Sequence, residues 1–240
     1  AYGLQFTGST YEGLATEYTP LSIANALYKR RQLLTKNPNM VLLAAVTYHC
    51  AFDGYLPADH EWWRRDQYGN KIVSWEEGPS YYLDWTNADL REYVANKAKK
   101  LVDLGIVDGV MLDYFTGDPL GESDTDPYRQ DLLSRIRNKI GSDKIIIVNS
   151  GMKTLPNCAQ YINGQFIECW YRTTAQDWQT KATVLSWAEA NAGYSPKING
   201  LETWYLNDRN DLDMMRANTA LALTHSDGYS LFSDPNDLPV

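Results

Sequence analysis

The chain has 240 residues, 44% of them hydrophobic and 22% charged, which are ordinary proportions for a globular protein with a sizeable core. Its net charge is −8, and no basic cluster exceeds the triplet Lys29-Arg30-Arg31, so it lacks the basic stripe that neutralises phosphates in nucleic-acid-binding proteins. Its apolar stretches are far shorter than the ~20 residues that span a bilayer. We therefore expect neither nucleic acid nor a membrane as a partner, and nothing in the sequence implies a protein partner.

Strand-like and helix-like patterns alternate along the chain. We predict strands at 2–6, 41–49, 81–85, 109–114, 144–149, 165–170, 197–204 and 228–232. We predict helices at 22–35, 87–104, 127–140, 175–192 and 212–223, with a single helical turn in 156–163. This alternation is typical of βα units and a parallel sheet. It predicts an α/β protein of one domain, 1–240, folded as a single closed (β/α)₈ TIM barrel.

Capping signals support the predicted helix boundaries. Thr86-Asn87 offers an N-cap for the helix at 87–104, and Gly105 offers its C-cap. Pro127 suits the first helical position of the next helix.

A long connection rich in aromatic residues follows the second predicted strand. It spans residues 50–80 and contains a hairpin signal at Gly69-Asn70. Long loops in compact domains are usually functional or disordered, and so many aromatic residues argue against disorder. We expect this segment to form a lid or wall over the barrel mouth, with Trp62 and Trp63 as substrate-binding candidates.

Acids and amides recur at the ends of the predicted strands, beside aromatic residues. A buried charge is costly, so this repetition is a poor choice for stability alone, whereas the strand ends of a (β/α)₈ barrel build its active site. The candidate catalytic residues are Asp113, Glu168 and Glu202. The candidate substrate-binding residues are Asn149, Trp170, Trp204, Tyr114, Asp84, His49, Trp62 and Trp63.

Two carboxyl groups on opposite sides of an anomeric carbon can cleave a glycosidic bond. Asp113 and Glu168 suit this chemistry, because strands four and six face each other across the mouth. Cys169 and Trp170 would give Glu168 apolar surroundings that raise its pKa. Glu202 is the alternative acid.

Several candidates have a second interpretation. Glu202 can instead hold a sugar hydroxyl while Trp204 stacks on a ring face, and the amide of Asn149 can bind a hydroxyl next to the reacting carbon. Asp84 either shapes the turn before the following helix or points into the mouth. His49 ends the second predicted strand and can reach the mouth from there.

The stretch from Tyr82 to Tyr114 carries two motifs, LDWTN followed by Arg91 and Tyr93, and then DGVMLD. They resemble the LD-x-x-N-x-x-x-R-x-Y and DGV-x-LD motifs of glycoside-hydrolase-like TIM barrels, a set of bacterial families. More distantly, the layout is similar to the endo-α-1,4-polygalactosaminidase family. The resemblance implies a glycosidase in which acids at the ends of strands four and six are catalytic. By position these are Asp113, as nucleophile or base, and Glu168, as general acid.

Two other functions stay open, a non-catalytic carbohydrate-binding barrel and a metal-dependent hydrolase. The sequence has no Gly-rich phosphate loop and no H-E-x-x-H motif, so we predict neither a cofactor nor a metal site. The three cysteines, Cys50, Cys158 and Cys169, match no metal-binding spacing, and buried thiols are expected. The chain begins at Ala1 rather than Met, which is expected either of a trimmed chain or of a secreted or periplasmic protein whose signal has been removed, and the two stay open.

Overall fold

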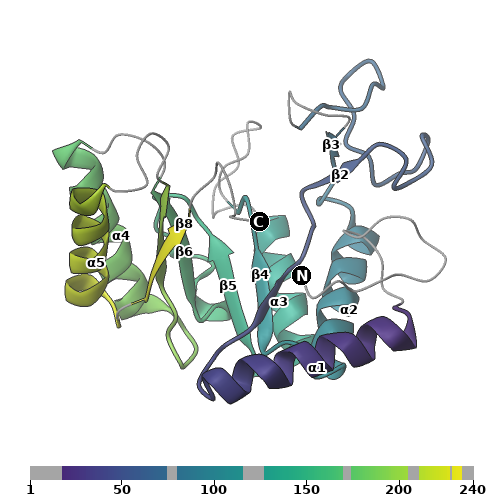
Figure 1. The fold of residues 1–240 in the computed structure, drawn as a ribbon. Coiled ribbons are helices and arrows are strands. Elements are labelled where there is room, and N and C mark those ends of the chain that lie inside the picture. Colours follow the sequence, from purple (N-terminus) through teal and green to yellow (C-terminus); the bar gives the residue numbers. More distant parts are fainter. Residues whose placement is uncertain are drawn as a thin grey trace. The chain divides into compact units, whose positions relative to one another are not determined.

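The computed structural model describes residues 18–74, 80–115, 127–169, 174–204, 211–227 and 229–233. The chain divides into two compact units, which are described separately. Unit 1 comprises Ala1–Leu112 and Asp131–Ile145, and unit 2 comprises Asp113–Gln130 and Ile146–Val240. From residue 80 onward, strands and helices alternate along the chain, as Figure 1 shows.

The helices are α1 (Pro20–Lys36), α2 (Ala88–Asp103), α3 (Pro127–Ile140), α4 (Ala175–Asn191) and α5 (Leu212–His225), with the short η1 (Ala159–Tyr161). The strands are β1 (Leu43–Ala45), β2 (Cys50–Phe52), β3 (Ser80–Tyr82), β4 (Gly109–Leu112), β5 (Ile145–Asn149), β6 (Gly164–Cys169), β7 (Gly200–Trp204) and β8 (Tyr229–Ser233). The predicted helices are confirmed to within two residues at each end. The first predicted strand, 2–6, lies outside the described residues.

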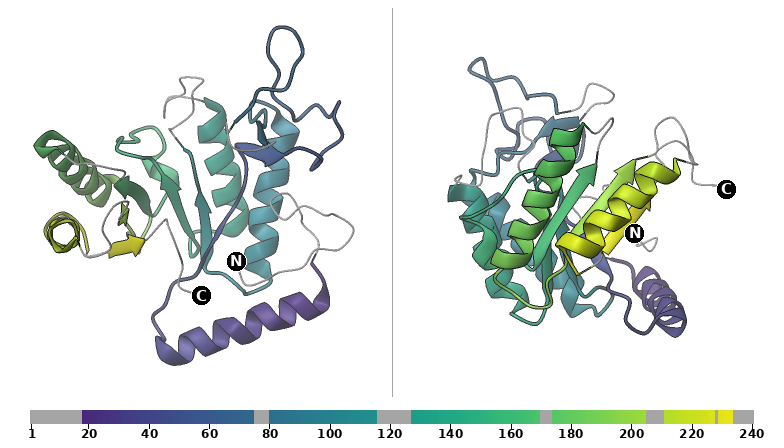
Figure 2. Two further views of the ribbon diagram at one scale, coloured as in Figure 1. Left: turned by 45° about the horizontal axis from the view of Figure 1, so that its top comes forward. Right: turned by 90° about the vertical axis from the view of Figure 1, so that its left-hand side faces the viewer.

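Unit 2 contains a run of parallel strands in chain order. β5 pairs with β6, β6 with β7, and β7 with β8. Helices α4 and α5 lie side by side against one face of β6, β7 and β8, as Figure 2 shows. The core between strands and helices contains Ile167 and Leu201 on the strands and Val184, Leu185 and Ala222 on the helices. The parallel βα arrangement predicted from the sequence is therefore confirmed in this part of the chain.

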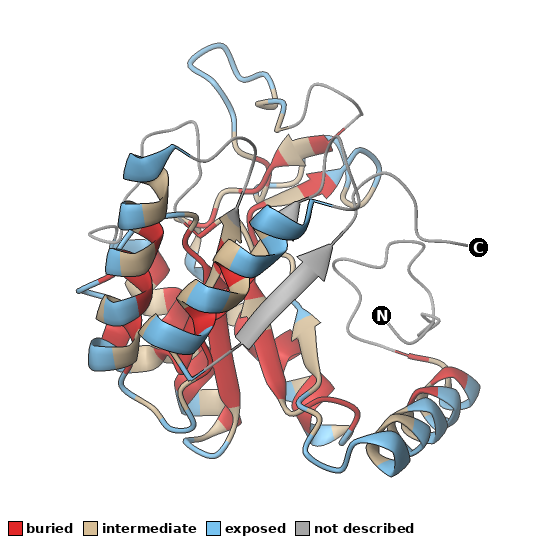
Figure 3. Ribbon diagram, turned by 60° about the vertical axis from the view of Figure 1, so that its left-hand side comes forward, coloured by how far each residue is buried: buried red, intermediate tan, exposed pale blue. Residues whose placement is uncertain are grey.

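Unit 1 combines a parallel strand pair with a small antiparallel one. β1 pairs in parallel with β4, placing Leu43 opposite Gly109. α1 is mostly exposed, with only Ser22 and Ala26 buried (Figure 3). A bidentate ion pair connects α1 to the rest of unit 1: the guanidinium of Arg30 donates to the two carboxylate oxygens of Asp108 at 2.5 and 2.9 Å.

The segment between residues 50 and 82 differs from its prediction. β3 pairs antiparallel with β2, whereas the sequence predicted a parallel barrel strand at 81–85. Bridges from Val73 to Tyr81 and from Trp63 to Leu83 tie the connection to the same strand. The predicted hairpin is confirmed, because Arg65 pairs with Lys71 around Gly69, whose φ is +85°. The sequence pattern of this segment did not reveal these short antiparallel strands, because runs of three residues are too short for a period of two to be recognised.

An Asp-Gly or Asn-Gly pair begins three of the parallel strands, β4, β6 and β7. The first residue of each pair, Asp108, Asn163 or Asn199, lies just before the strand. Its side chain accepts a hydrogen bond from a backbone N–H of the neighbouring strand segment, at 2.8–2.9 Å. The donors are Leu42, Ile146 and Gln165. In each case the donor immediately precedes the residue that pairs with the glycine, so these side chains specify strand register. We call these three bonds the Asx latches.

The glycine of the pair allows a close approach of two backbones. A Cβ on Gly109 would lie 2.0 Å from the carbonyl oxygen of Ile145, and a Cβ on Gly164 would lie 1.8 Å from that of Ile198. At Gly200 the nearest atom would be Phe166 Cδ2, at an ordinary 3.8 Å. Glycine is therefore sterically required at the first two positions and not at the third.

The Asp108 latch predicts how stability depends on pH. Burial raises the pKa of Asp108, but the hydrogen bonds from Arg30 and the Leu42 N–H outweigh it and hold the pKa below its ordinary value. A carboxyl group whose pKa is lower in the folded state stabilises the fold above its unfolded pKa, about 3.9, and loses this effect as the pH falls through the folded value.

We therefore expect Asp108→Asn to be less stable than the wild type at neutral pH and to lose less stability on acidification. Urea unfolding at pH values from about 3 to 7 measures both differences. Parallel stability curves for the two proteins would contradict this role of Asp108.

No helix within the described ranges is both long and apolar enough to cross a bilayer.

Candidate active site

The predicted acids of unit 2 lie on one face of its strands. Ile167 and Leu201 point toward the helices, so the alternating residues Glu168 and Glu202 point to the opposite face. The register places Glu168 opposite Glu202 on neighbouring strands. Asn149, at the end of β5, lies opposite Phe166, two residues before Glu168, and therefore shares this face. In a barrel this is the interior face.

Asp113 follows β4 directly, and its carboxylate is held on one side. Its Oδ1 accepts hydrogen bonds from Asn149 Nδ2 and from the backbone N–H of Tyr114, both at 2.8 Å. Among the described residues, no donor contacts Oδ2. Asp113 as a whole is half-buried, so the residue has partial access to solvent.

Asn149 makes three hydrogen bonds, two of which reach the turn after β4. Its Oδ1 accepts from the N–H of Gly151 at 3.0 Å, which requires Nδ2 to be the atom that faces Asp113. Its backbone carbonyl also accepts from the N–H of Phe115 at 2.9 Å. The residue as a whole is 4% exposed, so the amide is used within the protein. Direct binding of a sugar hydroxyl by Asn149 therefore stays a prediction.

Tyr114 and Arg129 complete this turn. Tyr114 adopts a left-handed backbone conformation with φ of 55°, which is uncommon for a residue with a side chain. Arg129, which is fully buried, donates to the carbonyl of Tyr114 at 3.3 Å and lies 5.5 Å from the ring of Phe115. Sequence reasoning missed Arg129, because an arginine in the first turn of a helix gives no signal that it is buried.

The other predicted residues of unit 2 are less fully described. Glu168 and Glu202 are both half-buried. Trp170 lies outside the described residues. Trp204 ends β7, but its side chain and that of Cys169 are not described. The predicted apolar surroundings of Glu168 therefore stay a prediction.

In unit 1, Asp84 makes contacts that fit the structural one of its two predicted roles. Its Oδ1 accepts from the hydroxyl and the backbone N–H of Thr86, at 2.6 and 3.2 Å. Asn87 caps α2 by accepting from the N–H groups of Asp89 and Leu90. His49 is 8% exposed and packs edge-on against Tyr48 at 5.4 Å, so its ring lies largely within the protein.

The two predicted tryptophans of unit 1 differ in their environments. Trp63 is 2% exposed, and its indole N–H donates to the carbonyl of Pro57 at 2.8 Å. Lys71 lies 4.8 Å from the centre of its ring, so this ring has a packing role in the structure. Trp62 is half-buried, and the centre of its ring lies 4.8 Å from that of His60 and 4.9 Å from that of Tyr93.

The motif LD-x-x-N-x-x-x-R-x-Y is largely structural in this fold. Arg91, which is 7% exposed, donates to the carbonyls of Trp85 and Thr86 at 2.8 and 2.7 Å, and to Asp131 at 2.6 Å. It thereby joins the start of α2 to the turn before it. Burial raises the pKa of Asp131, but hydrogen bonds from Arg135 and Arg91 outweigh this and lower it overall.

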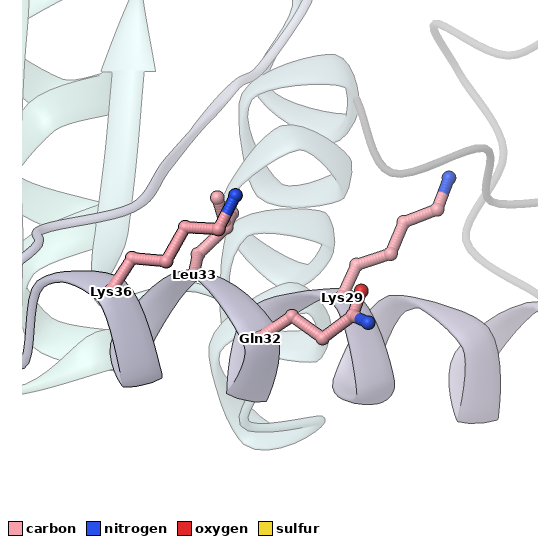
Figure 4. A pocket seen from close by; sticks show the side chains of 4 residues that line it. All are labelled: Lys29, Gln32, Leu33 and Lys36. Carbon is pink, nitrogen blue, oxygen red and sulfur yellow. The ribbon is translucent and has the colours of Figure 1, made fainter.

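Two further features of the described residues do not form another candidate site. Within the part of the chain that the structure describes, no three His, Cys, Asp or Glu side chains gather as a metal site would require. A pocket on α1 has a volume of about 290 Å³ and is lined by Lys29, Gln32, Leu33 and Lys36 (Figure 4). It is lined by no carboxylate, so it does not offer the acid chemistry of the Asp113 region.

A comparison with protein families identifies the chain. Residues 43–223 match the family described as hypothetical glycosyl hydrolase family 15. The match covers most of the 240 residues. The chain belongs to this family. The resemblance to the glycoside-hydrolase-like families is thereby confirmed. No curated protein sequence matches the chain.

Solved structures show the same fold at low sequence identity. An α-galactosidase from Thermus thermophilus in complex with stachyose has a TM-score of 0.55 at 16% identity, covering 88% of this chain and 49% of that one. The maltogenic α-amylase AmyB from Thermotoga neapolitana has a TM-score of 0.55 at 17% identity, covering 89% and 50%. Ega3 from Aspergillus fumigatus in complex with galactosamine has a TM-score of 0.58 at 12% identity, covering 85% and 79%. The chain spans about half the length of the first two.

Proposed function

We propose that the chain is a glycoside hydrolase that closes as a (β/α)₈ barrel and cleaves a poly- or oligosaccharide with Asp113 and Glu168. The observation that carries this proposal is the carboxylate of Asp113. Two donors hold its Oδ1, and no donor in the described residues holds its Oδ2. A carboxylate held in this way presents one oxygen in a fixed direction, as attack on an anomeric carbon requires.

The position of Glu168 supports a catalytic pair. Asn149 is in register with Phe166, two residues before Glu168. With strands about 4.8 Å apart and a rise of about 3.3 Å per residue, the Cα atoms of Asn149 and Glu168 are about 8 Å apart. Asp113 contacts the amide of Asn149, so its carboxylate and that of Glu168 can approach the ~5–9.5 Å that glycosidases use.

In the proposed reaction, Glu168 donates its proton to the leaving oxygen while Asp113 acts on the anomeric carbon. Asp113 either attacks the anomeric carbon and forms a glycosyl-enzyme, which a water deprotonated by Glu168 then hydrolyses with net retention, or it removes a proton from a water that attacks the same carbon, giving inversion. Glu202, opposite Glu168, would bind a sugar hydroxyl or serve as the alternative acid. We propose Tyr114, Trp170 and Trp204 as the aromatic groups that contact the sugar, with His49, Asp84 and Trp62 as further candidates.

A hydrolysis screen tests this function. The panel contains α-galactosides such as stachyose, α-glucans such as maltose oligomers, and a galactosamine polymer, because structures of this fold hold such sugars or are named for them. We expect release of reducing ends from one class by the wild type and at least about a 10³-fold loss in Asp113→Asn. Binding without release by the wild type would instead favour a carbohydrate-binding barrel. Equal turnover by wild type and variant would contradict the role of Asp113.

A further inference from the structure

We propose that Asn149 is a positioning residue that aims Oδ2 of Asp113 at the substrate. The inference rests on the proposed function, because it assigns Asp113 as the reacting carboxylate. It changes the role of Asn149 from a group that binds a sugar hydroxyl to a group that orients the catalytic acid.

The hydrogen bonds of Asn149 fix the orientation of its amide group. The N–H of Gly151 donates to Oδ1 of Asn149. If the amide flipped, its NH₂ group would face this N–H, and two donors cannot form a hydrogen bond. Nδ2 is then fixed on Oδ1 of Asp113 at 2.8 Å. With Tyr114 N–H on the same oxygen, both donors lie on one side of the carboxylate and restrict rotation about its terminal bond.

The backbone of Asn149 fixes the same turn a second time. Its carbonyl accepts from the N–H of Phe115, so one residue of β5 contacts both Asp113 and the residue two positions later. Arg129 holds the carbonyl of the residue between them, Tyr114. These contacts hold the left-handed conformation of Tyr114, which would otherwise be costly.

The surroundings of Asn149 favour this role over substrate binding. Asn149 is 4% exposed, and both the oxygen and the nitrogen of its amide have partners within the protein. A group that bound a hydroxyl would change mainly the affinity for the substrate. A group that orients Asp113 would change mainly the rate of the chemical step, because a small misplacement of a reacting group can cost about 10²-fold.

The first experiment measures the contact without a substrate. Melting temperatures are compared for the wild type, Asn149→Ala, Asp113→Ala and the double variant. A direct hydrogen bond predicts a shift in the double variant that differs clearly from the sum of the two single shifts. Strict additivity would overturn the proposed contact, whether or not the chain proves to be a glycosidase.

The second experiment measures turnover on the glycan that the screen identifies. Asn149→Asp keeps the atom that accepts from Gly151 and replaces the donor that faces Asp113 with an acceptor. We expect Asn149→Asp and Asn149→Ala to lower kcat by about 10²-fold, with KM changed less than about threefold.

Asn163→Ala is the matched control, since Asn163 is also a buried asparagine at a strand end, 1% exposed, but belongs to an Asx latch. It should lower the melting temperature and leave kcat near that of the wild type. A rise in KM at unchanged kcat in the Asn149 variants would overturn the positioning role in favour of hydroxyl binding. An inactive wild type would refute the proposed function, while the melting experiment would still judge the contact.

Discussion

Gly164→Ala is expected to destabilise the protein by at least about 4 kcal/mol, whereas Gly200→Ala is expected to change stability by less than about 1 kcal/mol. Both glycines follow an asparagine and begin a parallel strand of unit 2. At Gly164, a methyl group would overlap the carbonyl oxygen of Ile198, a backbone atom that cannot move without shifting its own segment. At Gly200, the same methyl group would meet only the ring of Phe166 at contact distance.

Thermal unfolding followed by circular dichroism measures this difference. For a protein of this size, 4 kcal/mol corresponds to a lower melting temperature by about 8–16 °C. Gly200→Ala serves as the control for a general effect of replacing a strand glycine. Similar melting temperatures for the two variants would show that the close approach of backbones at Gly164 is not required.

Glu168→Gln is expected to lower kcat on the natural glycan by about 10³-fold, while Glu202→Gln lowers it by less than about tenfold. The two side chains occupy equivalent positions on neighbouring strands, so they provide a matched comparison. Glu168 is on the strand next to the one that holds Asn149 and, through it, Asp113. Glu202 is one strand further away, which makes it the less suitable partner for an acid pair.

The leaving group of the substrate separates acid catalysis from other roles. A 4-nitrophenol leaving group needs little protonation, so Glu168→Gln should recover most of its rate on a 4-nitrophenyl glycoside of the same sugar. A group that only binds a hydroxyl would lose the same factor on both substrates. If Glu202→Gln shows the leaving-group dependence and Glu168→Gln does not, the two roles are exchanged.

The sequence predicted regular elements best where the signal was local. Asn87, which caps α2, and Pro127, which begins α3, marked helix starts that the structure confirms. The strands β5 to β8 were predicted to within three residues, because each is a short apolar run that follows a helix. The antiparallel pairing of β2 with β3 was not predicted, since pairing direction depends on partners about 30 residues away rather than on local alternation.

The sequence predicted which strand-end residues share a face, but not the contacts that they make. Strand-end position correctly grouped Glu168, Glu202 and Asn149 on one face. It could not indicate that the amide of Asn149 is used on Asp113, because this depends on the hydrogen bond from Gly151 that orients it. Burial of Arg129 and Trp63 depends on tertiary packing and was likewise not evident from residue type.

The Asx latches separate two tasks that a repeated βα architecture must perform. Alignment of neighbouring strands is encoded at their amino-terminal ends, where Asp108, Asn163 and Asn199 bind backbone groups. The residues at the opposite ends, which include Asn149 and Glu168, therefore do not have to set the strand register. Surface loops following these strands should accept insertions and exchanges without shifting the sheet, which makes them the appropriate region in which to alter sugar preference by directed evolution.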